Sequence, residues 1–221
     1  TGLLRYSDNP SNLSLPGADT RDQMSGTAGV FTTHYVVLTN LKASTTYYFE
    51  IVTGSASYSD NNKPYQVRTG VITNSGAEDI ISGKVLSVDG QGLEGAVVYV
   101  EIDGGETLSA LTKNGGMWQL NLGEVKDSKG QVLAYDRQNQ QVSLFVQGGV
   151  LGTATALTNT ASDSPVMDIV MGTNVNLVAT TDLTSGEPAS NAVTPEEISS
   201  GAGFGGLADG VVATETEELL N

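Results

Sequence analysis

The most constraining feature of the sequence is the stretch LTNLKASTTYYFEIVTG at residues 38–54. Leu38 precedes a polar bend, and Tyr47, Phe49 and Ile51 follow the bend at a period of two. Alternation at this period indicates β-strands with one buried face, because successive side chains of a strand point to opposite faces. The stretch therefore predicts a strand, a corner and a second strand that share one apolar surface.

The rest of the chain repeats this pattern in short segments. Val, Thr and Ser are abundant, and the 27 glycines punctuate the sequence between apolar runs. This spacing is typical of proteins built from many short strands. The segments predicted as strands are 3–7, 34–41, 45–54, 64–70, 81–90, 95–102, 117–123, 141–149, 165–172 and 174–182. We predict an all-β fold with two β-sandwiches in tandem and an acidic, largely irregular C-terminal tail.

Charge is spread unevenly over the 221 residues and divides the chain into three parts. Residues 1–75 hold five basic and five acidic residues, residues 76–172 hold five and twelve, and residues 173–221 hold none and eight. The net charges of the three parts are 0, −7 and −8, which gives the total net charge of −15. This balance argues against nucleic acid and anionic lipid as partners, because phosphate groups are bound by Lys and Arg. It favours solubility or a partner that carries cations.

Several classes of protein are excluded by simple absences in the sequence. The chain has no cysteine, which rules out disulfides and thiolate metal sites. We find no run of about 20 apolar residues, so this chain is not predicted to insert into a membrane. There is no signal-peptide pattern and the first residue is Thr, from which we expect a processed or partial product.

The corner at residues 38–51 resembles the turn between the fifth and sixth strands of fibronectin type III domains. That family repeats a Leu-x-x-Leu-x-Pro-x-Thr-x-Tyr pattern, which is matched here by Leu38, Leu41, Thr45 and Tyr47, with Ala43 in place of Pro. The resemblance implies that the Tyr47 phenol reaches back to an upstream backbone group and fixes the turn. The Tyr-Tyr-Phe version is similar to fibronectin-like domains that precede purple-acid-phosphatase-type and bacterial surface domains.

The resemblance also implies an incomplete first sandwich. In that family LLRYS at residues 3–7 corresponds to the third strand, so two strands would precede it. A sandwich without them would expose its core and two strand edges. We expect these strands either to lie upstream in a longer protein or to be supplied by another segment, including one from a neighbouring subunit.

Residues 80–172 resemble, over most of their length, a carboxypeptidase-regulatory-like Ig-type domain, close to repeats of bacterial surface proteins. The matching residues are Gly83, Val85, Asp89-Gly90, Gly95-Ala96, Val98, Thr112 and the run Gly115-Gly116-Met117-Trp118. Trp118 is predicted to lie in the core, near Val98 and Leu120. The resemblance implies a non-catalytic spacer or adhesion module.

The tail at residues 173–221 carries two segments that could form strands. Residues 174–182 include Asn174, Val175, Leu177 and Val178, and residues 210–214 include Val211 and Val212. Either segment is a candidate strand for donation to the open sandwich of a neighbouring subunit. TPEEI at 194–198 predicts a short helix, and GAGFGG at 201–206 a linker.

Catalytic and metal sites are hard to find in the sequence. The one histidine, His34, is interpreted as an edge residue, and no Ser-His-Asp set, zinc pair or G-x-S-x-G motif is present. No cofactor is predicted, apart from weak calcium candidates at the loop carboxylates Asp60, Asp89, Asp103 and Glu106. A further alternative is an amide bond between Lys84 and Asp168.

We predict a non-catalytic, extracellular protein of a bacterial or archaeal cell surface with a structural or adhesive role. Its expected form is a homo-oligomer or surface assembly, such as a pilus-like filament whose chains complement one another's sheets. The alternative is an accessory module of a secreted or surface-anchored enzyme, which binds carbohydrate or acts as a spacer. Tyr6, Tyr58 and Tyr65 are the candidate sugar platforms. An enzyme in its own right is a third class with the least support.

Overall fold

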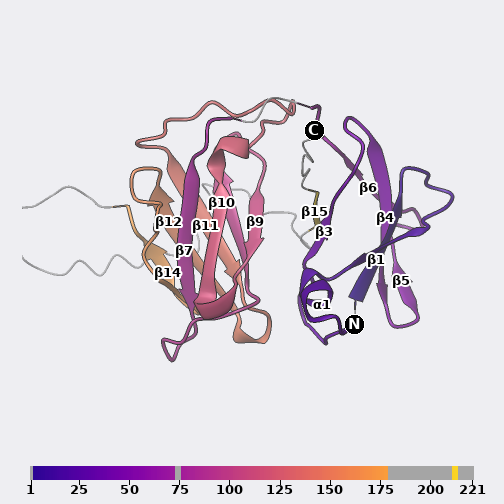
Figure 1. The fold of residues 1–221 in the computed structure, drawn as a ribbon, viewed down its shortest axis with the longest axis horizontal. Helices are drawn as coiled ribbons and strands as arrows, with labels where there is room; N and C mark the ends of the chain where they lie inside the picture. The colour runs from indigo at the N-terminus through magenta and orange to yellow at the C-terminus, as the bar shows by residue number, and fades with distance from the viewer. Residues whose placement is uncertain (1, 73–75, 179–210, 214–221) are drawn as a thin grey trace, which may run out of the picture. The chain divides into compact units, whose positions relative to one another are not determined.

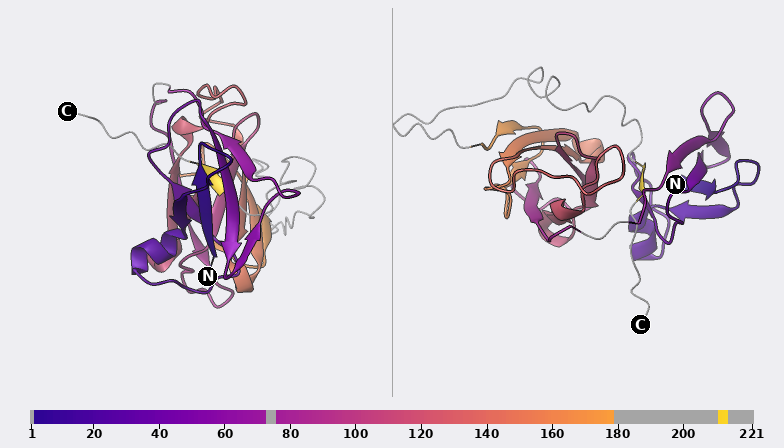
Figure 2. Two further views of the ribbon diagram at one scale, coloured as in Figure 1. Left: turned by 90° about the vertical axis from the view of Figure 1, so that its right-hand side faces the viewer. Right: turned by 90° about the horizontal axis from the view of Figure 1, so that it is seen from above.

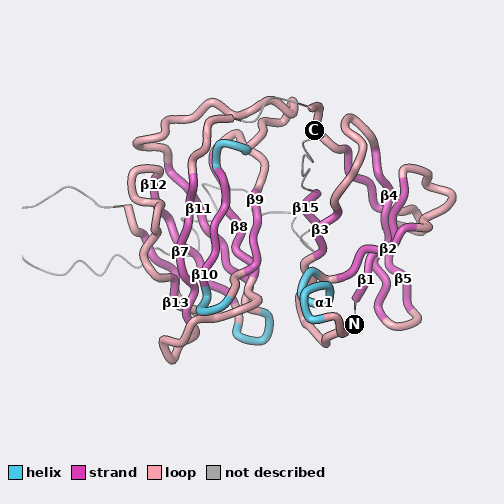
Figure 3. Tube along the Cα trace, in the orientation of Figure 1, coloured by secondary structure: helices cyan, strands magenta, loops and turns pink. Residues whose placement is uncertain are grey.

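The computed structural model describes residues 2–72, 76–178 and 211–213, and it is an all-β fold (Figures 1 and 3). The chain divides into two compact units, which we call the first unit (Thr1–Asn74 with Ala208–Asn221) and the second unit (Ser75–Leu207). The predicted helix at 194–198 and linker at 201–206 lie outside the described residues. Among the described helices, none has both the length and the apolar character needed to cross a membrane.

The first unit contains an antiparallel sheet that is built around its longest strand. Its strands are β1 (Gly2–Ser7), β2 (Leu15–Ala18), β4 (Thr46–Thr53), β5 (Ala56–Tyr58) and β6 (Tyr65–Arg68). The order is β2-β1-β4-β5, and β6 pairs with β4 as well. A short helix, α1 (Thr20–Ser25), follows β2. Neither β2 nor α1 was predicted, because this region has too few apolar residues to give a periodic signal.

A second, much smaller sheet completes the first unit. It joins β3 (Val36–Leu38) to β15 (Val211–Ala213), which comes from the far end of the sequence. The two strands are parallel, with Val36 opposite Val211, Val37 opposite Val212 and Leu38 opposite Ala213. The views in Figure 2 show β15, in yellow, beside β3.

The corner between β3 and β4 has the geometry that the sequence predicted. Leu38 is buried, Leu41 packs against it, and the backbone N–H of Lys42 donates to the Tyr47 hydroxyl oxygen at 3.0 Å. The Thr69 hydroxyl donates to the Lys42 carbonyl at 2.6 Å and also accepts from the Thr45 backbone N–H at 2.9 Å. The turn is therefore fixed from both sides, and it sets the position of β3 relative to β4.

The second unit is built from two larger sheets. One has the order β10-β7-β13 and the other β14-β12-β11-β8-β9. The strands are β7 (Ile80–Leu86), β8 (Val97–Ile102), β9 (Leu108–Leu111), β10 (Met117–Asn121), β11 (Gln141–Gln147), β12 (Thr153–Asn159), β13 (Ile169–Val170) and β14 (Asn174–Asn176). Three short 3₁₀ turns connect them at η1 (Asn114–Gly116), η2 (Leu122–Glu124) and η3 (Gly149–Leu151).

The core of the second unit lies between these sheets and is nearly closed to solvent. Val142, Leu144 and Val146 of β11 have no exposed surface. Trp118 is 4% exposed and belongs to the same apolar cluster, as predicted. A Cβ at Gly83, the residue paired with Trp118, would lie 3.0 Å from the indole ring. Glycine at this position therefore leaves room for the ring.

We expect Tyr47→Phe to destabilise the first unit by about 1–2 kcal/mol, because the Lys42 N–H would lose its acceptor in a partly buried turn. Urea unfolding followed by near-ultraviolet circular dichroism should show an earlier transition. Fluorescence of Trp118, the one tryptophan, reports on the second unit and should not change. The matched control is Tyr48→Phe, whose hydroxyl bonds no described residue. Equal effects of the two variants would contradict the role of the Tyr47 hydroxyl.

Candidate functional site

The candidate site is the inner face of the first unit's sheet together with β3, which packs on that face. The alternation along β1 and β4 places Leu4 and Tyr6 opposite Ile51 and Phe49 on this face. Leu4 is 2% exposed, but Tyr6, Phe49 and Ile51 are only half-buried. Half-buried aromatic and aliphatic side chains on the inner face of a sheet indicate incomplete cover.

The two units differ sharply in how much apolar surface they bury. The cluster of buried apolar residues in the first unit consists of Leu4, Val36 and Leu38. The corresponding cluster of the second unit has 17 members. A small unit with so few buried side chains has little hydrophobic stabilisation of its own. Further cover of the half-buried inner face would therefore add to the stability of this unit.

The backbone of β3 adds a strand edge to this apolar face. Within the described residues, β15 is the one strand that pairs with β3. Unpaired N–H and C=O groups along a strand edge favour the addition of another strand. The site thus combines the two features that strand addition requires, a backbone edge and apolar positions beside it.

A buried carboxylate positions β3. The side chain of Asp19 is 0% exposed and lies 2.8 Å from Arg21 Nη2 and 3.1 Å from His34 Nδ1. It also accepts the backbone N–H of Tyr35, the residue before β3, at 3.0 Å. The Thr20 N–H donates to the Tyr35 carbonyl at 2.7 Å. Because Asp19 also caps helix α1 through the Arg21 N–H, this one group joins the helix to the start of β3.

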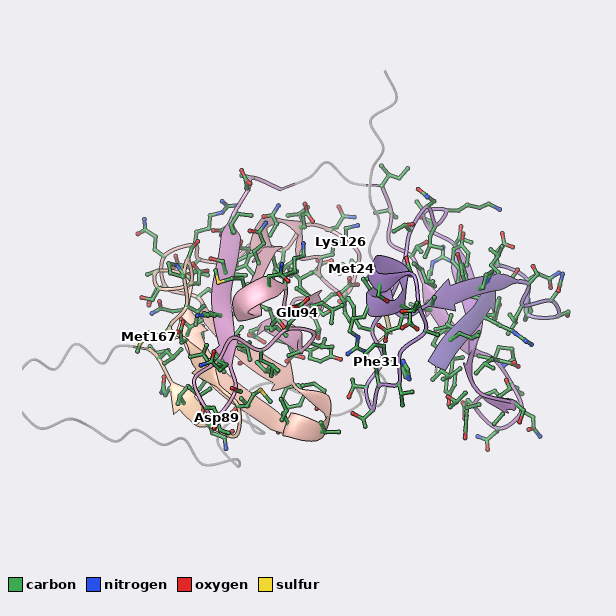
Figure 4. All side chains as sticks on the ribbon, turned by 60° about the horizontal axis from the view of Figure 1, so that its bottom comes forward. Met24, Phe31, Asp89, Glu94, Lys126 and Met167 are labelled. Atoms are coloured by element: carbon green, nitrogen blue, oxygen red, sulfur yellow. The ribbon has the colours of Figure 1, made fainter. Side chains whose placement is uncertain are left out.

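The rest of this cluster closes around the Arg21 guanidinium. Arg21 lies over the Phe31 ring at 3.8 Å from the centroid and donates to the Thr33 carbonyl; Phe31 is labelled in Figure 4. Burial alone would raise the pKa of Asp19, but hydrogen bonds from Arg21 and Tyr35 and the Arg21 charge outweigh it. They lower the pKa to about 2. This cluster was not predicted from the sequence, in which His34 was interpreted as an edge residue, although an Asp before a short helix is a capping signal.

The two candidate donor segments of the tail lie in different units. Asn174 and Val175 belong to β14, which pairs in parallel with β12, and the Leu177 N–H donates to the Leu157 carbonyl at 2.6 Å. In this chain that segment thus extends its own sheet. Val211 and Val212 belong to β15 and lie on the β3 edge. The structure therefore brings the second segment, and not the first, to the β3 edge.

The calcium candidates are not brought together. Asp60 lies in the turn between β5 and β6 of the first unit, whereas Asp89, Asp103 and Glu106 are exposed in loops of the second unit; Asp89 is labelled in Figure 4. Within residues 2–72 and 76–178, no three His, Asp or Glu side chains gather to hold a metal ion. The described residues therefore give calcium no support.

The candidate sugar platforms share one face of the first unit's sheet. By register Tyr6 and Tyr65 lie on either side of Phe49, and Tyr58 is on the same face. Tyr6 packs beside Tyr47 at 6.2 Å between ring centroids, and Tyr65 stacks on Phe49 at 5.3 Å. Tyr58 is 55% exposed on the short strand β5. Tyr6 and Tyr65 are thus covered in part by neighbouring rings.

Lys84 and Asp168 precede Val85 and Ile169, a pair of residues that face the core of the second unit. Because side chains alternate along a strand, Lys84 and Asp168 point away from that core. Asp168 is exposed to solvent. The pair therefore lacks the buried surroundings in which an amide bond between side chains would be favoured.

A second buried carboxylate lies in the second unit. Asp163 is 5% exposed, and its Oδ2 atom has no hydrogen-bond partner among the described residues. Burial, and then the charge of Asp79, raise the pKa of Asp163 to about 6. Asp79 in turn accepts the Tyr135 hydroxyl at 2.6 Å and lies 3.8 Å from Arg137 Nε.

Comparison of the chain with protein-family models gives no match, and comparison with curated proteins gives none either. The resemblances of residues 38–51 and 80–172 to known domain families stay predictions. Function is therefore argued from the geometry of the site.

The Asp19 cluster predicts an acid-sensitive first unit. Since the folded pKa is about 2 and the ordinary value is 3.8, this carboxylate contributes stability that is present above pH 4 and lost as the pH falls toward 2. The contribution is about 2 kcal/mol. Near-ultraviolet circular dichroism at increasing urea concentration should show this loss. Asp19→Asn should remove most of this pH dependence and lower the stability at pH 7. An unchanged dependence of stability on pH in the Asp19→Asn variant would contradict this prediction.

The Asp163 carboxylate predicts the opposite response in the second unit. Its folded pKa of about 6 exceeds the ordinary 3.8, so its contribution to stability falls as the pH rises from about 4 to 6. The loss is on the order of 3 kcal/mol. Urea unfolding followed by Trp118 fluorescence should give a higher midpoint at pH 5 than at pH 7.5. Asp163→Asn should flatten this dependence, whereas Asp168→Asn, at an exposed position, should retain it.

Proposed function

We propose that this protein is a non-catalytic structural or adhesive building block of a cell-surface assembly, in which chains are joined by strand addition at the β3 edge. The observation that carries the proposal is the pairing of β3. Within the described residues, its one sheet partner is β15, whose residues lie 175 positions further along the chain than the β3 residues that they pair with.

The inner face of the first unit supplies a reason for a strand to bind there. Phe49, Ile51 and Tyr65 are half-buried, so covering the rest of each contributes a part of the about 1.5–3 kcal/mol that complete burial of a large apolar side chain gives. A strand beside β3 satisfies the backbone edge, as β15 does within this chain, and the half-buried face leaves apolar surface for a further partner. Both features point to assembly as the use of the site.

The chemistry of the described residues supports a non-catalytic role. His34 is held by Asp19 and lies edge-on against Phe31 at 6.0 Å. Asp79 is held by Tyr135, and Asp163 is buried in the second unit. These groups stabilise turns and strand ends, and none of them forms a pair of nucleophile and base of the kind that hydrolytic sites require.

A place on the cell surface is supported by composition and by resemblance. The net charge of −15 keeps a chain soluble and disfavours binding to nucleic acid and anionic lipid. Both predicted domain types are similar to modules of bacterial surface proteins. The accessory-module alternative has less support, because its candidate platforms Tyr6 and Tyr65 pack against other aromatic residues of the first unit.

Negative-stain electron microscopy with light scattering tests the proposal. We expect the protein to form filaments or higher oligomers, and Val37→Pro to abolish them, because proline removes a ladder N–H and resists pairing. The matched control is Val175→Pro on β14, another three-residue strand paired in parallel. Trp118 fluorescence checks that the second unit of each variant folds, and near-ultraviolet circular dichroism checks the first.

Two outcomes would overturn the proposal. One is an assembly that Val37→Pro leaves intact in a folded protein. The other is dispersed particles of the native material whose mass exceeds that of this chain, since strands from a longer polypeptide would then cover the face.

A further inference from the structure

The pairing of β15 with β3 is short. It spans three residue pairs in a sheet of two strands. Two-stranded sheets are marginally stable in water, and parallel pairs are slightly weaker than antiparallel ones. The occupant of the β3 edge is therefore held by little backbone pairing and can be replaced by an equivalent strand.

The chain that leads to β15 is long enough to reach more than one acceptor. Residues 179–210, which lie outside the described part, separate Val178 from β15. A chain of this length can span up to roughly 100 Å when extended. Closing a longer loop costs only a little more entropy than closing a shorter one. Length therefore permits β15 to pair with β3 of its own chain or of another copy.

The residues of the segment suit a donated strand. Val211 and Val212 are β-branched, a residue type that favours a pleated and partly buried strand. Asp209 and Glu215 flank the segment in a tail without Lys or Arg. Like charges on either side disfavour the pairing of one tail with another. The segment is thus suited to pair with β3 and poorly suited to pair with itself.

We propose that Val211–Ala213 is an exchangeable strand, which caps β3 within an isolated chain and occupies β3 of a second copy in the assembly. This inference rests on the proposed function and names its partner, the same segment of another chain. Each chain has one β3 edge and one β15 strand, so the contact is head-to-tail. Head-to-tail contacts that do not close into a ring produce filaments.

The in-chain pairing also regulates assembly. A strand tethered to its own acceptor has an effective concentration near the millimolar range. In dilute solution the β3 edge of each chain therefore stays paired with β15 of the same chain. Exchange of β15 between chains requires a high local concentration or an existing filament end. Assembly should depend steeply on protein concentration and should be accelerated by preformed fragments.

Cysteine cross-linking tests the exchange directly, because the chain has no cysteine of its own. Val37 and Val212 are opposite each other in the register, so Val37→Cys and Val212→Cys place two thiols across the pair. The two single variants are mixed, allowed to assemble and oxidised. Each single variant alone and the pair Val37→Cys with Asn174→Cys serve as controls.

We expect a disulfide-linked dimer from the mixture that is absent from each control. The double variant Val37→Cys/Val212→Cys should give a series of disulfide-linked oligomers when it is assembled. In dilute solution it should give a monomer with an internal disulfide. Deletion of residues 208–221 should abolish assembly, whereas deletion of 214–221, which retains β15, should not.

The outcomes separate this inference from the proposed function. Filaments that form while the double variant yields only bridged monomers would overturn the exchange and leave assembly at the β3 edge standing with another occupant. A dimer with Asn174→Cys, or a protein lacking 208–221 that still assembles, would likewise overturn it. Absence of any assembly would overturn both proposals.

Discussion

The buried carboxylate of Asp19 is the interaction on which the first unit depends. It binds Arg21 and His34, caps helix α1 and accepts the backbone N–H of Tyr35 at the start of β3. Because β3 supplies two of the three buried residues in the apolar cluster of this unit, the carboxylate controls how the inner face is covered. In the first unit a polar cluster therefore holds strands in place, a role that the larger hydrophobic core has in the second unit.

The second unit of the same chain has a complete hydrophobic core. Its core buries 17 residues in one cluster, including Val142, Leu144 and Val146 of β11. The apolar residues on β1, β4 and β6 of the first unit are mostly half-buried instead. The difference lies in the number of strands available to cover the face, and this imbalance motivates the assembly proposal.

Particular residues show how far the sequence predicts the fold. The period of two at Tyr47, Phe49 and Ile51 predicts β4, and the resemblance of residues 38–51 to a fibronectin type III corner implies the hydrogen bond of Tyr47. Strand β12, with the sequence TATALTN, was missed because its buried side chains include two alanines, which give a weak apolar signal. The role of Asp19 was missed because its partners His34 and Tyr35 meet it only through the folding of the loop.

By itself the sequence determined that this protein is rich in short strands, acidic and free of cysteine, because periodicity, charge and composition are local properties of the chain. It also marked Val211 and Val212 as candidates for a strand, together with Asn174 and Val175. Tertiary structure alone decided between them, placing Val211–Ala213 on β3 and Asn174–Asn176 on β12. The physical reason is that an open strand edge is a property of how distant segments are arranged, which no local pattern encodes.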